Sequence, residues 1–308
     1  MTAGTEAETA GAARRSLFGR VVLHGIVHPL RAYPFGLYPT LMLGIFFVIP
    51  FVIMIDISFW HRVESKFYEP GFELTHYARF FEGPLFRTHL WVSVQFSVLS
   101  SLLALIVAVP FTYFISRFRR RPQVVALVFV LCVLSLSEVI IAYSLSVVMG
   151  RPAGVLNVLV WLDVLRIPPS LFPGYGAVMF GLAYFNVPFA VLILYPSCTR
   201  LDRELTEAAQ TMGASPVATF FTVVLPLLER TIIAAFVLLF VFTMGAFVTP
   251  TWLGRPEDTM MAQLIADQAL SRGNVPFAAA LAVFFMAVTA LLSVIVVWLR
   301  RGERGGAA

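Results

Sequence analysis

One acidic side chain stands inside an apolar stretch, where a carboxyl group is costly unless it has a partner or a task. Glu138 lies in the segment SLSEVIIAYS, and Tyr143 follows it by five positions. An ionisable group at membrane depth is expected to face the interior of a helix bundle and to meet a partner or a proton there. Two hypotheses follow: Glu138 lines a translocation path and meets a cationic solute, or it is a structural acid hydrogen-bonded between helices. Tyr143 is a further candidate for the path, and packing is the alternative.

A second polar candidate is Asn186, in the segment YFNVPF beside Pro188. Proline has no backbone N–H, so it leaves a carbonyl group of the preceding turn without its usual donor. Neighbouring side chains satisfy such freed groups inside membranes. Asn186 is therefore predicted either to line the same path as Glu138 or to satisfy a packed neighbour.

Enzymatic chemistry has little support in the residue types. The chain has five histidines and all fall outside the apolar segments or at their rims, at positions 24, 28, 61, 76 and 89. A nucleophile needs a base nearby, and neither GxSxG nor HExxH is present. A phosphate-binding loop needs a lysine after its glycines, but the one lysine, Lys66, stands in ESKFYE. Cys132 and Cys198 lack metal-ligand spacing. We therefore expect no catalytic or metal site and no bound cofactor.

The elements that position these residues are long apolar segments. Hydrophobic residues make up 59% of the 308 positions and charged residues 13%, and the mean hydropathy is +0.86. Soluble domains carry roughly a quarter charged residues. A bilayer-spanning helix needs about 20 apolar residues. The sequence predicts an all-α membrane protein with six transmembrane helices, at about 36–58, 91–116, 123–149, 174–196, 229–251 and 276–299.

The arginines predict the orientation of these helices. Basic residues without acids follow the second predicted span in RFRRR (117–121), and more arginines flank both chain ends. Because cytoplasmic loops carry an excess of Lys and Arg, both termini and the 204–230 segment are predicted to be cytoplasmic. Anionic membrane lipid accounts for the net charge of +5 without any nucleic acid.

Three regions are predicted along the chain. Residues 1–34 form a cytoplasmic tail, in which the pattern of positions 17–31 fits either a helix on the membrane surface or a basic flank. Residues 35–300 form the transmembrane domain, and residues 301–308 form a second cytoplasmic tail.

The segment ELTEAAQTMGASPVATFFTVVLPLLER (204–230) predicts a short helix, a turn and a second helix. Asp202 is a suitable N-cap for the first helix. Gly213 fits the left-handed residue that ends it, and Ser215 and Pro216 fit the start of the second helix. The apolar residues of the first helix recur at helical spacing and predict one narrow stripe, made of Leu205, Ala208, Ala209 and Met212.

Such a stripe on the cytoplasmic side suits docking into a groove of a partner protein. The alternative is a connecting loop that happens to be helical.

The same residues carry a resemblance to a known family. Glu207-Ala208-Ala209, then Gly213, then Val223-x-Leu225-Pro226 resembles the cytoplasmic EAA motif of ABC importer permeases, with Val223 where that family favours isoleucine. From about residue 36 onward the chain is similar to permeases of the spermidine/putrescine type, through GVLNVL (154–159), the stretch 195–216 and GAFVTPTWLGRPEDTMMAQLI (245–265).

This resemblance implies a type I ABC importer permease in the bacterial inner membrane. It implies that the EAA helix docks on a cytoplasmic ABC ATPase dimer that uses ATP, that a second homologous permease completes the path, and that a periplasmic or extracellular solute-binding protein delivers cargo. Glu207 would make a polar docking contact and Gly213 the bend. The residues implied in ATPase coupling are Leu205, Glu207, Ala208, Ala209, Met212, Gly213, Leu225 and Pro226.

The cargo that the resemblance implies is a polyamine-like cation. Opines, phosphonates and other small organic solutes stay open, because an external binding protein selects the cargo first. Similar permeases often carry an arginine shortly after the position of Glu138, where this chain has Ile141 and Ala142. Two rival functions are an ion-coupled secondary transporter and a membrane scaffold that transports nothing.

Overall fold

The computed structural model describes residues 34–63, 68–151, 162 and 170–302, and the predictions for both chain tails lie outside these residues except at positions 34, 301 and 302. The regular structure of the described residues is helical, apart from one isolated β-bridge between His61 and Glu69. The all-α prediction is confirmed. The chain forms two compact units, residues 1–57 and 58–308.

The first unit contains the helix α2 (Pro34–Ile57). Its span Tyr38–Ile57 is apolar all round and buries none of its residues within the described chain. A helix without a polar face is expected where the solvent is lipid.

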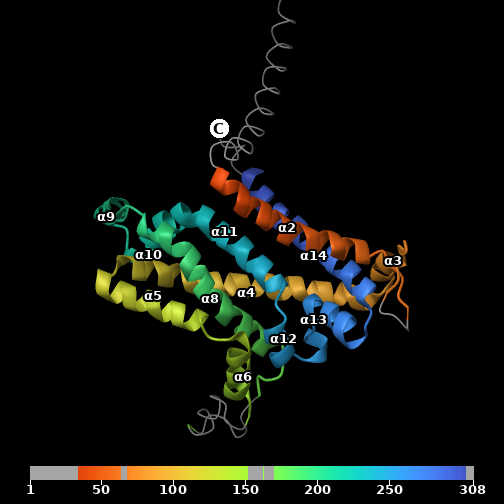
Figure 1. The fold of residues 1–308 in the computed structure, drawn as a ribbon. Coiled ribbons are helices and arrows are strands. Elements are labelled where there is room, and N and C mark those ends of the chain that lie inside the picture. Colours follow the sequence, from red (N-terminus) through yellow and green to blue (C-terminus); the bar gives the residue numbers. More distant parts are fainter. Residues whose placement is uncertain (1–33, 64–67, 152–161, 163–169, 303–308) are drawn as a thin grey trace, which may run out of the picture. The chain divides into compact units, whose positions relative to one another are not determined.

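The core of the second unit is a bundle of three long helices (Figure 1): α4 (Pro84–Arg117), α8 (Tyr175–Thr199) and α11 (Leu225–Met244). Small side chains lie fully buried along the α4–α8 contact, among them Ala104 and Ala190. Small residues let helix backbones approach closely, which is how helices associate when lipid removes the hydrophobic driving force.

The helix α11 is the end of a longer continuous helix. Residues 216–244 run through α10 (Pro216–Thr219), the π-helical turn η1 (Phe220–Val224) and α11. Pro226 lies two residues after the end of η1 and cannot donate a hydrogen bond to the turn before it, a condition that favours a π turn. The predicted fifth span, 229–251, therefore ends too late, and it starts inside a helix that already runs from Pro216. The helix stops at Gly245, and a separate helix, α12 (Val248–Leu253), follows.

The predicted third span, 123–149, is broken. It consists of α5 (Arg120–Leu134) and α6 (Glu138–Met149), which meet at 92°. Ser135 ends α5 with its hydroxyl donating to the carbonyl of Leu131 at 2.9 Å. Serine competes for backbone groups in this way and interrupts helices. Five described helices are long and apolar enough to cross a membrane, and the bent pair makes a sixth if it counts as one span.

The remaining elements of the second unit are four short ones and one long helix: α3 (Thr75–Glu82), η2 (Pro256–Asp258), α13 (Met261–Ala266), η3 (Asp267–Ser271) and the long α14 (Val275–Gly302). The pattern of residues 255–272 favours a short amphipathic helix with Asp258 as its cap. A helical run from Met261 to Ser271, through α13 and η3, confirms the helix but not the cap. The Asp258 carboxylate accepts from the backbone N–H of Arg255 at 3.2 Å and caps only η2. α13 is fixed separately, since the N–H of Met261 donates to the Ser93 hydroxyl of α4 at 2.7 Å.

Candidate functional site

A cavity of about 190 Å³ lies where α6, α8, α11 and the start of α12 meet. Its lining includes Glu138 and Asn186, so the structure brings two predicted residues together. The remaining lining residues are Leu182, Phe185, Phe242, Thr243, Gly245, Ala246, Phe247, Val248 and Thr249. Asn186 stands near the middle of the membrane-spanning helix α8, and transporter binding sites commonly lie at that depth.

Glu138 is the first residue of α6, directly after the break that ends α5. Its Oε1 accepts two hydrogen bonds from Thr249 of α12, from the hydroxyl at 2.7 Å and from the backbone N–H at 3.1 Å. Among the described residues, no donor binds its other oxygen, Oε2. The carboxylate thus holds α6 to α12 through one oxygen and lines the cavity at the same time, and its role in a translocation path stays a prediction.

Asn186 is 1% exposed and joins three helices. Its Nδ2 donates to Thr243 Oγ1 of α11 at 2.8 Å and to Ser100 Oγ of α4 at 3.4 Å. The Thr243 hydroxyl uses its hydrogen to donate to the Leu239 carbonyl at 2.8 Å, so it can only accept a hydrogen bond from Asn186. The amide of Asn186 must therefore point its nitrogen, and not its oxygen, at Thr243. Asn186 satisfies neighbours and lines the cavity.

Tyr143 lies away from this cavity. Its ring is exposed and meets Trp252 of α12 edge-on, with ring centroids 6.3 Å apart. The structure therefore places Tyr143 in a packing contact between α6 and α12, and does not group it with Glu138 and Asn186.

Aromatic rings give the cavity a second chemical character. Phe185 and Phe242 stack with centroids 6.4 Å apart, and Phe247 completes the aromatic lining. Ring faces carry negative potential and attract organic cations, as a carboxylate does. A short alkylammonium group matches a lining of one carboxylate, one amide and several rings.

Sequence reasoning missed Thr249, Thr243 and the phenylalanines. Thr249 falls inside the predicted fifth span, where a threonine is indistinguishable from one more lipid-facing residue. The signal that could have revealed it is the pair Gly245 and Pro250. Glycine is common just after a helix ends, and proline is common near the start of the next helix.

The predicted caps around α9 (Arg203–Thr211) are confirmed. Asp202 Oδ1 accepts from the N–H of Glu204 at 3.1 Å, and Ser215 Oγ accepts from the N–H of Ala218 at 3.2 Å. Gly213 has φ +91°, the left-handed region. Its N–H donates to Gln210 O and the next N–H, of Ala214, to Ala209 O. This is the Schellman arrangement, which satisfies the last carbonyls of a helix.

Three of the four residues in the predicted apolar stripe of α9 are exposed, and the fourth, Ala209, is buried. Ala209, 7% exposed, and Thr206 turn inward toward α10 and η1. Leu205, Glu207, Ala208 and Met212 are exposed, and Met212 is 83% exposed. Of the other residues assigned to coupling, Leu225 packs partly against the core and Pro226 is exposed. Figure 1 shows α9 at the opposite end of α8 from α6 and α12.

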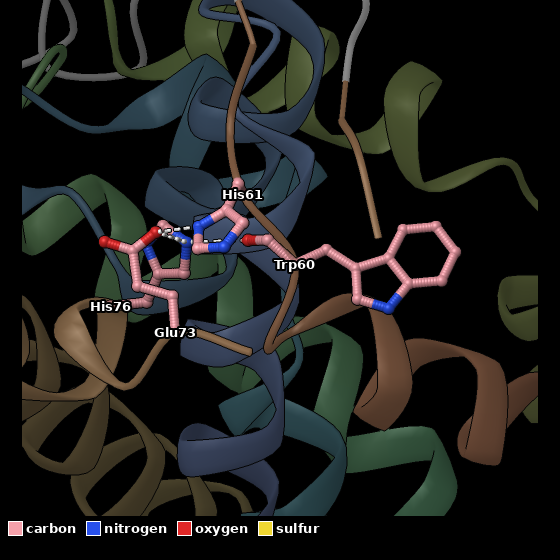
Figure 2. A network of polar contacts seen from close by, with 4 residues as sticks. All are labelled: Trp60, His61, Glu73 and His76. Carbon is pink, nitrogen blue, oxygen red and sulfur yellow. Dashed lines mark hydrogen bonds and ion pairs between the residues drawn. The ribbon is translucent and has the colours of Figure 1, made fainter. Parts of the chain in front are cut away.

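A polar network that the sequence does not predict joins residues 58–63 to α3 (Figure 2). His61 Nδ1 donates to Glu73 Oε2 at 2.8 Å, and His76 Nε2 donates to the Trp60 carbonyl at 3.1 Å. The hydrogen bond from His61, followed by one from Thr75, lowers the pKa of Glu73 below its usual 4.5.

A bundle of apolar helices around a mid-depth polar cavity, with a capped and exposed helix at one end, defines a multi-pass transport protein. The model of the family described as binding-protein-dependent transport system inner membrane component matches residues 100–305, and the chain belongs to that family.

Relatives and solved structures agree with this assignment. The spermidine/putrescine transport system permease protein PotB of Haemophilus influenzae is 31% identical over 250 residues, which is 80% of this chain and 87% of that protein. PotB of Escherichia coli K12 is 28% identical over 83% of this chain and 92% of its own length. A bacterial ABC transporter that imports the acidic polysaccharide alginate has the same fold, with a TM-score of 0.67, 17% identity and coverage of 93% of this chain and 98% of that one.

The protein is thus the permease subunit of a binding-protein-dependent ABC importer in the inner membrane. It is a transport subunit and not an enzyme, because the ATPase of such a system is a separate subunit. The prediction of an importer permease is confirmed, and the ion-coupled and scaffold alternatives are set aside.

Proposed function

We propose that the imported solute is a polyamine-like organic cation and that the cavity at Glu138 forms part of its path. The observation that carries this proposal is the joining of a carboxylate, the Asn186 amide and phenylalanine rings in one cavity. The names of the PotB relatives, which are spermidine/putrescine permeases, support the same cargo class.

Glu138 is suited to an ammonium group because its two oxygens have separate roles. Thr249 donates twice to Oε1 and keeps the side chain in one position. Oε2 then remains for the cargo, and the nearby rings bind the methylene groups. A pre-positioned carboxylate loses little conformational entropy when the cation arrives.

The ATPase drives import through its contact with α9. The exposed residues Leu205, Glu207, Ala208 and Met212 form the face that docks on an ATPase subunit, and Gly213 makes the bend below it. The next element is the continuous helix of 29 residues from Pro216 to Met244, about 40 Å long. Its far end carries Phe242 and Thr243 of the cavity lining. One stiff helix thus joins the docking segment to the cargo path, which suits alternating access by rigid motion.

The complete importer contains further chains. Two ATPase subunits bind and hydrolyse ATP, and a second homologous permease contributes the other half of the path. A solute-binding protein outside the membrane delivers the cargo, in keeping with the family description. This chain needs no cofactor of its own.

The test is uptake of radiolabelled putrescine and spermidine into liposomes that hold the complete complex. Glu138→Gln keeps an oxygen for Thr249 but removes the charge. We expect at least about a tenfold loss of cation uptake, the effect of losing one charge-assisted contact. Glu257→Gln, in the exposed turn η2, is the matched control and should leave uptake unchanged. Unchanged uptake and selectivity in Glu138→Gln, or import of an anion in place of the cation, would remove Glu138 from the path.

A further inference from the structure

A groove separates α4 from α14 on the surface of the second unit. Its volume is about 710 Å³, and it is lined by Arg87, Thr88, Leu90, Trp91 and Val94 of α4 and by Val288 and Leu292 of α14. We propose that this groove binds one phospholipid molecule, with the phosphate on Arg87 and an acyl chain along the apolar walls.

The depth of the lining residues matches one membrane leaflet. Arg87 and Arg117 stand near the two ends of α4 and are 30 positions apart, which is about 45 Å along a helix. A bilayer with its headgroup regions is about 40–45 Å thick. Arg87 therefore lies at headgroup level. Val288 lies near the middle of the apolar span Val275–Trp298 of α14, so the groove extends from the headgroups to the bilayer centre.

The headgroup end offers donors that lack acceptors. Arg87 is exposed and makes no hydrogen bond or ion pair with any described residue. Trp91, one helical turn further, is 67% exposed and lines the same groove as Arg87. Arginine binds phosphate through two parallel N–H groups, and tryptophan favours the membrane interface. A phosphodiester between the two side chains satisfies both preferences.

The inner end of the groove is apolar. Leu90, Val94, Val288 and Leu292 offer no polar side chain, so water there would lack the partners that an ordered water needs. The contact between Phe86 and Phe277, with centroids 5.4 Å apart, holds the two helices together at one end of the groove. The volume falls in the range of about 300–1,000 Å³ that is usual for small-molecule sites.

Charge complementarity favours a lipid over a protein helix as the occupant. An apolar helix in the groove would cover Arg87 without supplying an acceptor, and an unpaired buried cation is costly. A phospholipid matches the groove at both ends: its anionic phosphate can bind Arg87, and its acyl chain can lie along the apolar wall.

Native mass spectrometry of the complete complex, purified from a bilayer of phosphatidylglycerol and phosphatidylethanolamine, tests the proposal. The wild type should retain one tightly bound phospholipid on this chain. Arg87→Ala should reduce its occupancy about tenfold, the loss expected for one charge-assisted contact. Val288→Phe, which fills the apolar wall, should reduce it similarly.

Two matched controls separate this site from general lipid contact. Arg119→Ala removes an exposed arginine beyond the opposite end of α4, and Ala290→Phe enlarges an exposed residue on the face of α14 opposite Val288 and Leu292. Both should retain the lipid. Excess inorganic phosphate should not displace it, because the acyl chain contributes to binding. Equal retention in all variants, displacement by phosphate alone, or a cross-link from Val94→Cys to a protein helix in place of lipid would overturn the proposal.

Discussion

At the residue scale, the organisation of the site depends on the two hydrogen bonds that Thr249 donates to Glu138. The acid is visible in the sequence because it interrupts an apolar run. Its partner is not visible, since Thr249 is 111 positions away and comes from a different helix. Whether a polar residue in a membrane is structural or functional depends on such a partner, and here the same carboxylate is held by α12 and lines the cavity.

Thr249→Val tests this contact with little change of side-chain shape. It removes the hydroxyl donor and leaves the N–H, so we expect a loss of about 0.5–1.5 kcal/mol in stability, the usual value of one hydrogen bond. Cation uptake should also fall, because Glu138 is then less firmly positioned. Thr249→Ser retains the hydroxyl and should restore both properties. Thermal unfolding of the complex and uptake assays are the measurements; equal values for the valine and serine variants would contradict this role.

Gly213 gives a second prediction at this scale. Its φ of +91° is unfavourable for side chains with a Cβ, although no atom lies within 4 Å of the position that a Cβ would take. Any defect of a variant is therefore conformational and not a steric clash. Gly213→Val should destabilise the turn by about 1–2 kcal/mol and weaken ATPase binding without affecting membrane insertion.

Asparagine tolerates the left-handed region, so Gly213→Asn should bind the ATPase nearly as the wild type does. Co-purification of the ATPase measures this. Normal recovery with the valine variant would speak against a role of the bend in docking.

At the element scale, local signals in the sequence predict short structures well and long apolar spans less well. The caps of α9 follow from Asp202, Gly213 and Ser215, because capping depends on neighbours in sequence. The break between α5 and α6 does not follow from hydropathy, which cannot distinguish a straight span from a bent one. The serines at 135 and 137 are the signal for that break.

The same limit explains the site. Glu138 and Asn186 can be found individually, but the cavity that joins them requires four helices to pack together. Which face of α9 points inward is also not predictable from its spacing, because the burial of Ala209 and Thr206 depends on α10 and η1, which pack against α9.

The packing of α8 against α12 supports the cavity and is sensitive at Gly181. A Cβ at this position would lie 2.7 Å from Leu253 Cδ1 and 2.8 Å from Thr249 Cγ2. Gly181→Val should therefore cost about 1–3 kcal/mol through overpacking and should disturb cation uptake through Thr249. Gly176→Val is the control on the same helix, where a Cβ would have no atom within 4 Å. Equal thermal stability of the two variants would contradict this packing.

The network around α3 predicts a dependence on pH. The pKa of Glu73 is lowered in the folded chain, chiefly by the hydrogen bond from His61. Because the pKa of Glu73 is lower in the folded chain than its usual 4.5, the ionised carboxylate stabilises the fold at pH values above 4.5. This stabilisation is lost as the pH falls from 4.5 through the lowered pKa of the folded chain.

The hydrogen-exchange protection factors of residues 58–63, which correct for the intrinsic effect of pH on exchange, should accordingly decrease below that pH. The effect should be small, below about 1 kcal/mol, because the pair is partly exposed. Glu73→Gln should remove this part of the pH dependence. An unchanged pH profile in that variant would show that the His61–Glu73 contact does not stabilise the loop.

At the scale of the whole molecule, the proposed cargo path and the proposed docking helix α9 lie at different ends of one continuous helix. The cavity lies at the α12 end of the continuous helix 216–244, and α9 lies beyond its other end. A chain of this family acts with an ATPase on another polypeptide, so its own structure must transmit motion over this distance. The continuous helix between the two sites is the element that can do so.

The most direct test of this coupling is ATP-driven uptake by the reconstituted complex with the docking face of α9 altered. Met212→Glu places a charge on the exposed end of that face and leaves the caps intact. We predict normal insertion, loss of ATPase binding and loss of ATP-dependent uptake. Full ATP-driven uptake with this variant, or solute accumulation by liposomes that contain the permeases but no ATPase, would contradict the proposed coupling.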